Sequence, residues 1–259
     1  MTAKIESGKI EPGRPIKSRP ISMGTALRVG VDTILLLILV VAAWHHTGPL
    51  GLDRWLVHGY VPRKSSAFFR LNNAITVVGS PGIVVVLAFV CALIVLVRWG
   101  SFAWAAACFA APGLAGVAET LGKSIIGRPR PATAALTGED GMGFPSGHAA
   151  GFTALVVILV LMTLALTPRR PRLANGLVVG AVLAAVVMAI TRVVVGAHYP
   201  TDAIAGMALG AVVAEVAAIA APILSQILDR LPRDRFPGTL LTRVDALSIR
   251  ARRAPGRSQ

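Results

Sequence analysis

Residues 71–97 read LNNAITVVGSPGIVVVLAFVCALIVLV and contain no Asp, Glu, Lys or Arg. An α-helix rises 1.5 Å per residue, so about 20 apolar residues cross about 30 Å of hydrocarbon. This stretch is long enough to do so. It predicts a membrane-spanning helix, and it decides the fold class expected for the chain.

Five further apolar runs accompany this one, at residues 26–46, 101–121, 149–166, 173–190 and 201–224. The chain of 259 residues is 54% hydrophobic and only 15% charged, whereas soluble domains carry about 25% charged residues. The sequence therefore predicts an all-α, polytopic membrane protein with six transmembrane helices in one bundle. Residues 49–73 mix aromatic and basic side chains, which suits either a segment in the membrane interface or an ordinary loop.

The segments outside the apolar runs are basic and suggest how the chain is organised. We expect a disordered cytoplasmic tail at 1–25, a membrane domain at 26–228 and a basic tail at 229–259. About two thirds of the 26 lysine and arginine residues fall on the side of the two tails, and such residues favour cytoplasmic loops. Both termini are therefore expected in the cytoplasm, and the protein is expected in the plasma (inner) membrane. The loops after the third and fifth spans then lie outside the cytoplasm.

The charge and the cysteines exclude other classes of protein. The formal net charge is +14, but the basic residues lie in tails and short loops, where membrane orientation and anionic lipid head groups account for them. A nucleic-acid partner is not expected. Cys91 and Cys108 lie inside apolar runs and indicate neither a disulfide framework nor a metal site. The oligomeric state is unknown from the sequence.

Three polar clusters lie where predicted spans end or begin. They are Lys123 with Arg130-Pro131, then Pro145-Ser146-Gly147-His148, and then Arg192 with His198 and Asp202. The third span ends near the first cluster and the fourth begins at the second. The fifth and sixth spans meet at the third cluster. Six spans therefore bring all three clusters to one membrane face, the extracytoplasmic one.

The residue types in these clusters suit an anionic ligand such as phosphate. Lys123, Arg130 and Arg192 supply three cations, and arginine can bind two phosphate oxygens at once. Ser146 adds a hydroxyl group, and Gly147 lets a ligand approach the backbone closely. This cluster also opens a helix, where free N–H groups favour anions.

His198 and Asp202 lie four residues apart at the predicted start of the last span. A carboxylate bound to one imidazole nitrogen leaves the other free to act as a nucleophile or base. A simple helix cap would also explain this pair. A metal between the histidines is disfavoured because three nearby cations would repel a divalent ion, and no cofactor is expected. The joint occurrence of the clusters favours the functional interpretation.

Together the three clusters resemble the signature of the type 2 phosphatidic acid phosphatase superfamily, integral-membrane lipid phosphatases related to vanadium haloperoxidases. The first motif, Lys, six residues and Arg-Pro, matches Lys123 and Arg130-Pro131. The second matches residues 145–148. The third matches Arg192, His198 and Asp202, with Thr191 where the family usually has Ser.

The resemblance implies an enzyme that hydrolyses phosphoric esters or diphosphates through a phosphohistidine and without a metal. His198 would attack phosphorus, Asp202 would orient its ring, and His148 would protonate the leaving oxygen and then activate water. The remaining motif residues would bind the phosphate oxygens; they are Lys123, Arg130, Ser146, Gly147 and Arg192.

The implied partners are a lipid phosphate substrate and the surrounding membrane lipids. A polyprenyl diphosphate, such as undecaprenyl or decaprenyl diphosphate, is the first hypothesis. Phosphatidylglycerophosphate and phosphatidic acid are the alternatives among hydrolase substrates. A lipid phosphotransferase that uses an acceptor alcohol is a second reaction type. A lipid-binding or transport protein without turnover is the alternative outside enzymes, and the complete set of histidines and aspartate argues against it.

Two carboxylates inside the predicted spans have open roles. Glu119 lies one turn before Lys123, so it either orients that lysine as an i, i+4 partner or is a polar residue without a special role. Glu215 lies midway along the last span. It either forms hydrogen bonds within the bundle or takes part in a proton relay.

Overall fold

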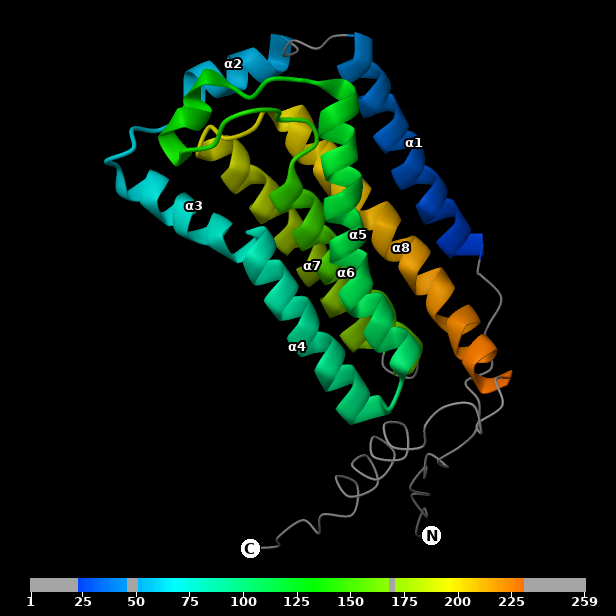
Figure 1. Ribbon diagram of the computed structural model, residues 1–259. Coiled ribbons are helices and arrows are strands. Elements are labelled where there is room, and N and C mark those ends of the chain that lie inside the picture. Colours follow the sequence, from blue (N-terminus) through cyan, green and yellow to red (C-terminus); the bar gives the residue numbers. More distant parts are fainter. Residues whose placement is uncertain (1–22, 46–50, 168–170, 231–259) are drawn as a thin grey trace, which may run out of the picture.

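The computed structural model describes residues 23–45, 51–167 and 171–230, and these residues are helical with connecting loops (Figure 1). The elements in chain order are α1 (Met23–His45), α2 (Gly51–Tyr60), α3 (Ala67–Val78), α4 (Pro81–Trp99), α5 (Phe102–Ile126), the 3₁₀ helix η1 (Ala132–Thr137), α6 (Gly147–Leu166), α7 (Pro171–Val194) and α8 (Pro200–Arg230). No strand occurs within the described ranges. The prediction of an all-α fold is confirmed for them.

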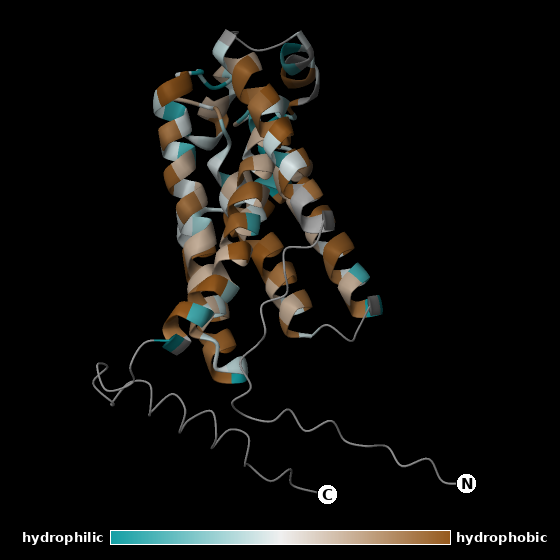
Figure 2. Ribbon diagram, turned by 90° about the vertical axis from the view of Figure 1, so that its right-hand side faces the viewer, coloured by the Kyte–Doolittle hydropathy of each residue, from teal (hydrophilic) through white to brown (hydrophobic). Residues whose placement is uncertain are grey.

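Five of the described helices, α4 to α8, are long and apolar enough to cross a membrane. A shorter apolar stretch, Val29–Trp44, lies within α1. Hydrophobic residues run along most of each helix (Figure 2), because a helix in lipid must satisfy its backbone groups internally and expose apolar side chains. These features indicate a multi-pass membrane protein, and the count of six spans stays a prediction.

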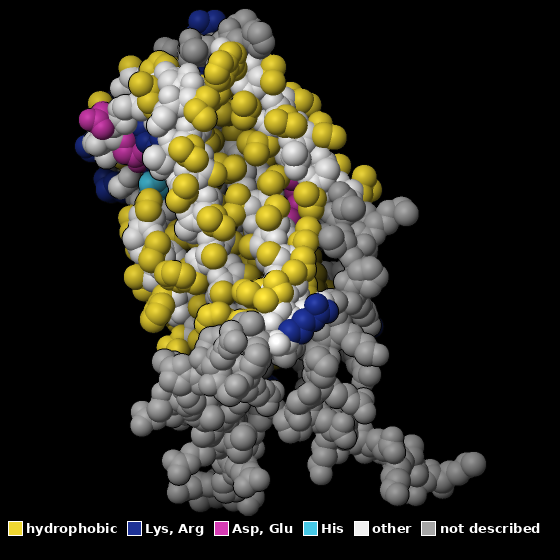
Figure 3. Space-filling view, turned by 45° about the vertical axis from the view of Figure 1, so that its right-hand side comes forward, with side chains coloured by type: hydrophobic (Ala, Val, Ile, Leu, Met, Phe, Trp, Pro, Cys, Tyr) yellow, Lys and Arg dark blue, Asp and Glu magenta, His cyan; other side chains and the backbone are white. Residues whose placement is uncertain are grey.

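Large apolar side chains are exposed around the bundle, among them Ile38, Val86, Phe89, Ile94, Val182 and Leu183. Figure 3 shows hydrophobic side chains over most of the described surface on one face, with acidic, basic and histidine side chains together at the upper left. A water-soluble protein rarely exposes an apolar surface of this extent. The surface suits contact with lipid.

Helix α6 lies in the middle of the bundle and packs most closely against α8. Small residues permit this close approach, as is usual for helices in membranes. A Cβ atom on Gly206 would overlap the carbonyl oxygen of Ser146, and one on Gly210 would overlap that of Ala150. This packing holds the start of α6 against the start of α8, where two of the predicted clusters lie.

The charge-free stretch 71–97 contains a spanning helix, as predicted, but the stretch is divided between two helices. Helix α3 ends at Val78, and α4 begins at Pro81 after the N-cap residue Ser80. Proline suits the first helical position because it lacks an N–H group and its φ angle is already helical. At the break, Met188 of α7 packs against Gly79, and its side chain would have to move to make room for a Cβ atom there. The charge-free stretch 71–97 thus supplies one spanning helix, α4, and part of the shorter helix α3.

Other boundaries also differ from the prediction. The third run continues to Ile126, where Gly127 ends α5 in the left-handed region with φ +63°. Residues 49–73, expected as an interfacial segment or loop, include α2 and the start of α3. The predicted tails 1–25 and 229–259 lie outside the described residues, except where α1 and α8 extend into them.

Candidate functional site

The three predicted clusters come together at one end of the bundle, where α5 and α7 end and α6 and α8 begin (Figure 1). Lys123 lies in the last turn of α5 and Arg192 in the last turn of α7. His148 and Asp202 lie in the first turns of α6 and α8. The contacts below confirm the convergence that the order of the spans predicts.

Arg130 and Arg192 converge on one carboxylate, that of Glu139, in the segment between α5 and α6. Glu139 Oε2 lies 2.7 Å from Arg130 Nη1, and Glu139 Oε1 contacts Arg192 Nη2. Burial alone would raise the pKa of Glu139, but the charges of Arg192 and Arg130 hold it below its ordinary value. Two guanidinium groups therefore already surround one anionic group.

His198 is buried beside these arginines, with 1% of its surface exposed. Its Nε2 atom lies 2.9 Å from Arg130 Nη1. Because arginine can only donate, Nε2 accepts, and the ring proton of the neutral imidazole lies on Nδ1. Burial, together with the charges of Arg130 and Arg192, lowers the pKa of His198 well below its ordinary value. His198 is therefore a neutral imidazole at neutral pH.

Asp202 faces His198 and also caps α8. Its Oδ2 atom lies 3.6 Å from His198 Nδ1 and accepts a hydrogen bond of 3.0 Å from the backbone N–H of Tyr199. Asp202 therefore does act as a helix cap, which is one of the two interpretations of the pair His198 and Asp202. This role does not exclude the other interpretation, because the same oxygen faces the imidazole.

His148 and Lys123 complete the cluster. His148 is half-buried and interacts electrostatically with Arg192, Glu139, His198 and Arg130. Lys123 forms an ion pair with Glu119 one turn earlier in α5 and interacts electrostatically with His198. Of the two interpretations left open for Glu119, the structure shows the pairing with Lys123.

Ser146 and Gly147 lie at the start of α6. The buried Ser146 is the N-cap residue, and its backbone N–H donates a 2.9 Å hydrogen bond to the carbonyl of Asp202. Its Oγ atom has no hydrogen-bond partner among the described residues. A Cβ atom on Gly147 would lie 2.8 Å from Glu119 Oε1. A larger residue there would require the Glu119 side chain to move away from the start of α6.

Sequence reasoning missed three charged residues of this region, namely Asp53, Arg128 and Glu139. Arg128 is buried and forms ion pairs with both Asp53 and Asp202. Its signal was the doubled Arg-Pro at 128–131, of which only the second pair matched a motif. Asp53 lies in the segment 49–73 and Glu139 in the connection between two spans, and only the tertiary structure shows their partners.

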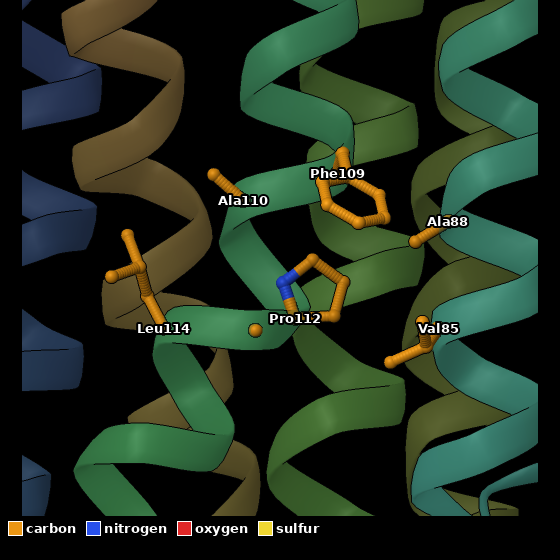
Figure 4. A pocket seen from close by; sticks show the side chains of 7 residues that line it. Val85, Ala88, Phe109, Ala110, Pro112 and Leu114 are labelled. Atoms are coloured by element: carbon orange, nitrogen blue, oxygen red, sulfur yellow. The ribbon is translucent and has the colours of Figure 1, made fainter.

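An apolar hollow of about 330 Å³ lies beside α4 and α5, around Pro112 (Figure 4). Its lining is Val85, Ala88, Phe109, Ala110, Pro112, Gly113 and Leu114. None of these side chains is charged. Leu114 precedes Lys123 by about two and a half helical turns, so this hollow is separate from the polar cluster.

Within the described residues, no group of three or more His, Cys, Asp or Glu side chains is arranged to hold a metal ion. Lys123, Arg130 and Arg192 form ion pairs with only two carboxylates, those of Glu119 and Glu139. The net positive charge of these five side chains would repel a metal ion. The expectation that the reaction needs neither metal nor cofactor stays a prediction.

The fold and this cluster define a class: an all-helical membrane protein with cations, histidines and an aspartate gathered at one end of its bundle. The profile of the PAP2 superfamily matches residues 102–222, from the start of α5 to Pro222 in α8. The matched region carries all three motifs, so the profile agrees with the resemblance that the motifs predict, and both indicate a phosphatase, a hydrolase of phosphoric esters.

A crystal structure of a transmembrane PAP2 type phosphatidylglycerolphosphate phosphatase from Bacillus subtilis has a similar fold, with a TM-score of 0.64. The two chains are 20% identical, and the alignment covers 80% of this chain and 99% of that one. At this identity the likeness concerns the fold. No curated protein sequence matches the chain significantly.

Proposed function

We propose that this protein hydrolyses a membrane lipid phosphate through a phosphohistidine on His198. One observation carries the proposal: Arg130 and Arg192 converge on a single carboxylate beside this buried imidazole. The two oxygens of Glu139 stand in for two phosphoryl oxygens. A phosphate group can replace Glu139 because it brings more negative charge and more acceptor atoms to the same guanidinium groups.

In the first step, the lone pair of His198 Nε2 attacks phosphorus, and the bond from phosphorus to the lipid oxygen breaks. His148 donates a proton to that oxygen, so the lipid leaves as an alcohol or as a lipid monophosphate. The Nδ1 proton stays on the His198 ring, and the Asp202 charge stabilises the cationic imidazole. The developing charge on the equatorial oxygens is stabilised by Lys123, Arg130, Arg192, Ser146 and the Gly147 N–H.

In the second step, His148 removes a proton from water, and the resulting hydroxide attacks the phosphohistidine. The phosphorus–nitrogen bond breaks, inorganic phosphate leaves, and His198 returns to its neutral form. An acceptor alcohol in place of water would give the phosphotransferase reaction. The half-buried position of His148 beside Arg192 supports a role on the open side of the phosphate.

We further propose that α1 also spans the membrane, which brings the number of spans to six, and that the membrane domain covers 26–228. Both termini are then cytoplasmic, and the site lies at the extracytoplasmic face of the plasma membrane. The basic residues of the two tails and of the connection between α6 and α7 support this orientation. Cysteine substitutions in α2 and at the tails, labelled with a membrane-impermeant thiol reagent in intact cells, test it.

The substrate is proposed as a phosphomonoester of a glycerophospholipid or as a polyprenyl diphosphate. The likeness to a phosphatidylglycerolphosphate phosphatase supports the first class. The second rests on the sequence-based expectation of an outward-facing lipid phosphatase. Values of kcat/KM for purified protein on phosphatidylglycerophosphate, phosphatidic acid and undecaprenyl diphosphate decide between them.

His198→Ala tests the mechanism itself. We expect no phosphate release from any of these lipids and no acid-labile phosphoenzyme. The matched control is Arg63→Gln, because Arg63 is exposed and has no described side-chain partner. Retained turnover in the His198 variant, with the control active, would show that another group attacks phosphorus.

A further inference from the structure

A line of buried charges leads from the surface helix α2 to the catalytic imidazole. Arg128, with 1% of its surface exposed, places Nη2 2.6 Å from Asp53 Oδ2 and Nη1 2.9 Å from Asp202 Oδ1. The other oxygen of Asp202 faces His198 Nδ1 at 3.6 Å. The order of groups is therefore carboxylate, guanidinium, carboxylate and imidazole.

Several contacts hold this arrangement at the start of α8. Asp53 Oδ1 accepts a 3.1 Å hydrogen bond from the Thr201 N–H, and Asp53 Oδ2 accepts one of 2.8 Å from Thr201 Oγ1. Arg128 Nη1 donates to the same Oγ1 atom at 2.6 Å. The Arg128 guanidinium also lies 5.0 Å from the centroid of the Tyr199 ring. The guanidinium is thus fixed in position relative to Asp202.

The charges explain why two carboxylates are present. A buried arginine paired with Asp202 alone would neutralise that carboxylate and weaken its stabilisation of a cationic imidazole. Asp53 adds a second negative charge on the far side of Arg128. The three groups then keep a net negative charge, which favours the positive charge that develops on His198 during attack.

We propose that Asp53 and Arg128 are positioning residues for the nucleophile. They hold the Asp202 carboxylate in place and preserve its negative charge toward His198. Neither residue lies among the groups that contact the phosphate in the proposed function, on which this inference rests. Helix α2, outside the residues that match the PAP2 profile, is thereby part of the active site.

The experiment uses Asp53→Asn, Arg128→Gln and the double variant of the full-length protein in detergent. Asp53→Asn keeps the size of the side chain and one acceptor oxygen, but it removes the charge and replaces the other oxygen by an NH2 group that can only donate. We expect kcat to fall about 10-fold to 100-fold, by analogy with residues that orient metal ligands through hydrogen bonds. KM should stay within about twofold, since phosphate contacts are unchanged.

Two readouts separate this role from a structural one. The acidic limb of the kcat/KM profile should move to lower pH in Asp53→Asn, because removing a negative charge makes protonation of His198 less favourable. In the double variant, the loss should be no larger than in Arg128→Gln alone, since Asp53 acts through Arg128. Asp53→Glu, which restores the charge, should recover part of kcat.

Asp53→Asn with wild-type kcat and an unmoved pH profile would overturn the inference, and so would losses that multiply in the double variant. Should a charge variant fail to fold, Thr201→Val removes only the hydroxyl that both residues bind. It should lower kcat without raising KM, and an unchanged kcat would also overturn the inference. Failure of the proposed function is distinct, because His198→Ala would then stay active.

Discussion

Arg130 Nη1 lies 2.9 Å from His198 Nε2, the nitrogen proposed to attack phosphorus. The same Nη1 atom lies 2.7 Å from Glu139 Oε2. One guanidinium group therefore contacts both the anion position and the imidazole. Burial lowers the pKa of His198, and the positive charge of Arg130 lowers it further. The hydrogen bond donated by Arg130 selects the tautomer with the proton toward Asp202.

This contact predicts how activity depends on pH. The lowered pKa of His198 means that the neutral, nucleophilic form persists as the pH falls below 6.5 and is lost only at lower pH. Arg130→Gln removes a nearby positive charge, so the pKa of His198 should rise. The acidic limb of the kcat/KM profile should then move to higher pH, and KM should rise because a phosphate contact is lost. A limb that stays in place or moves to lower pH would contradict the assigned cause.

If His148 is the general acid, the effect of replacing it should depend on the leaving group of the substrate. His148→Ala should lower kcat about 10²-fold to 10⁴-fold for a lipid monoester, because an alkoxide leaves poorly without a proton. With an aryl phosphate, whose phenolate leaves without protonation, the same substitution should lower the rate of phosphoenzyme formation much less. Rapid-quench measurements of the first turnover on both substrates provide the test. Equal decreases in rate on the lipid monoester and the aryl phosphate would show that His148 is not the general acid.

The contacts of Glu139 predict that its carboxylate competes with the substrate phosphate for Arg130 and Arg192. Glu139→Gln weakens the contacts that occupy Arg130 and Arg192, so KM and the inhibition constant of inorganic phosphate should both fall, about tenfold for 1.4 kcal/mol. The neighbouring exposed Asp140, replaced by Asn, is the matched control. Weaker phosphate binding in Glu139→Gln would instead mean that the carboxylate helps to hold the arginines for substrate.

The packing of α6 on α8 predicts a loss of stability without any change to a charged group. Gly206→Ala would place a methyl group against the carbonyl of Ser146, and the helices would have to separate. Such overpacking costs about 1–3 kcal/mol. Gly180→Ala is the control, because a Cβ atom there meets nothing within 4 Å. Thermal unfolding in detergent should show a lower Tm for Gly206→Ala only.

Much of the fold and site could be predicted because the membrane restricts the possible structures. A long apolar run in lipid must be a helix, since its backbone groups have no other partners. The order of such runs then placed Lys123, His148 and Asp202 at one end of the bundle. The break between α3 and α4 was missed because hydropathy does not distinguish an apolar loop residue from an apolar helix residue, although Pro81 was a local signal.

By itself, the sequence determined the class of the fold, the resemblance to the PAP2 superfamily and the residues that form the three motifs. These depend on local hydrophobicity and on short spacings along the chain. Only the tertiary structure decided that Glu139 lies between Arg130 and Arg192, and that Arg128 joins Asp53 to Asp202. Asp53 and Arg128 are 75 residues apart, and no local pattern encodes a pairing over that distance. The packing of α2 against the start of α8 brings them together, and burial of the charges requires that they pair.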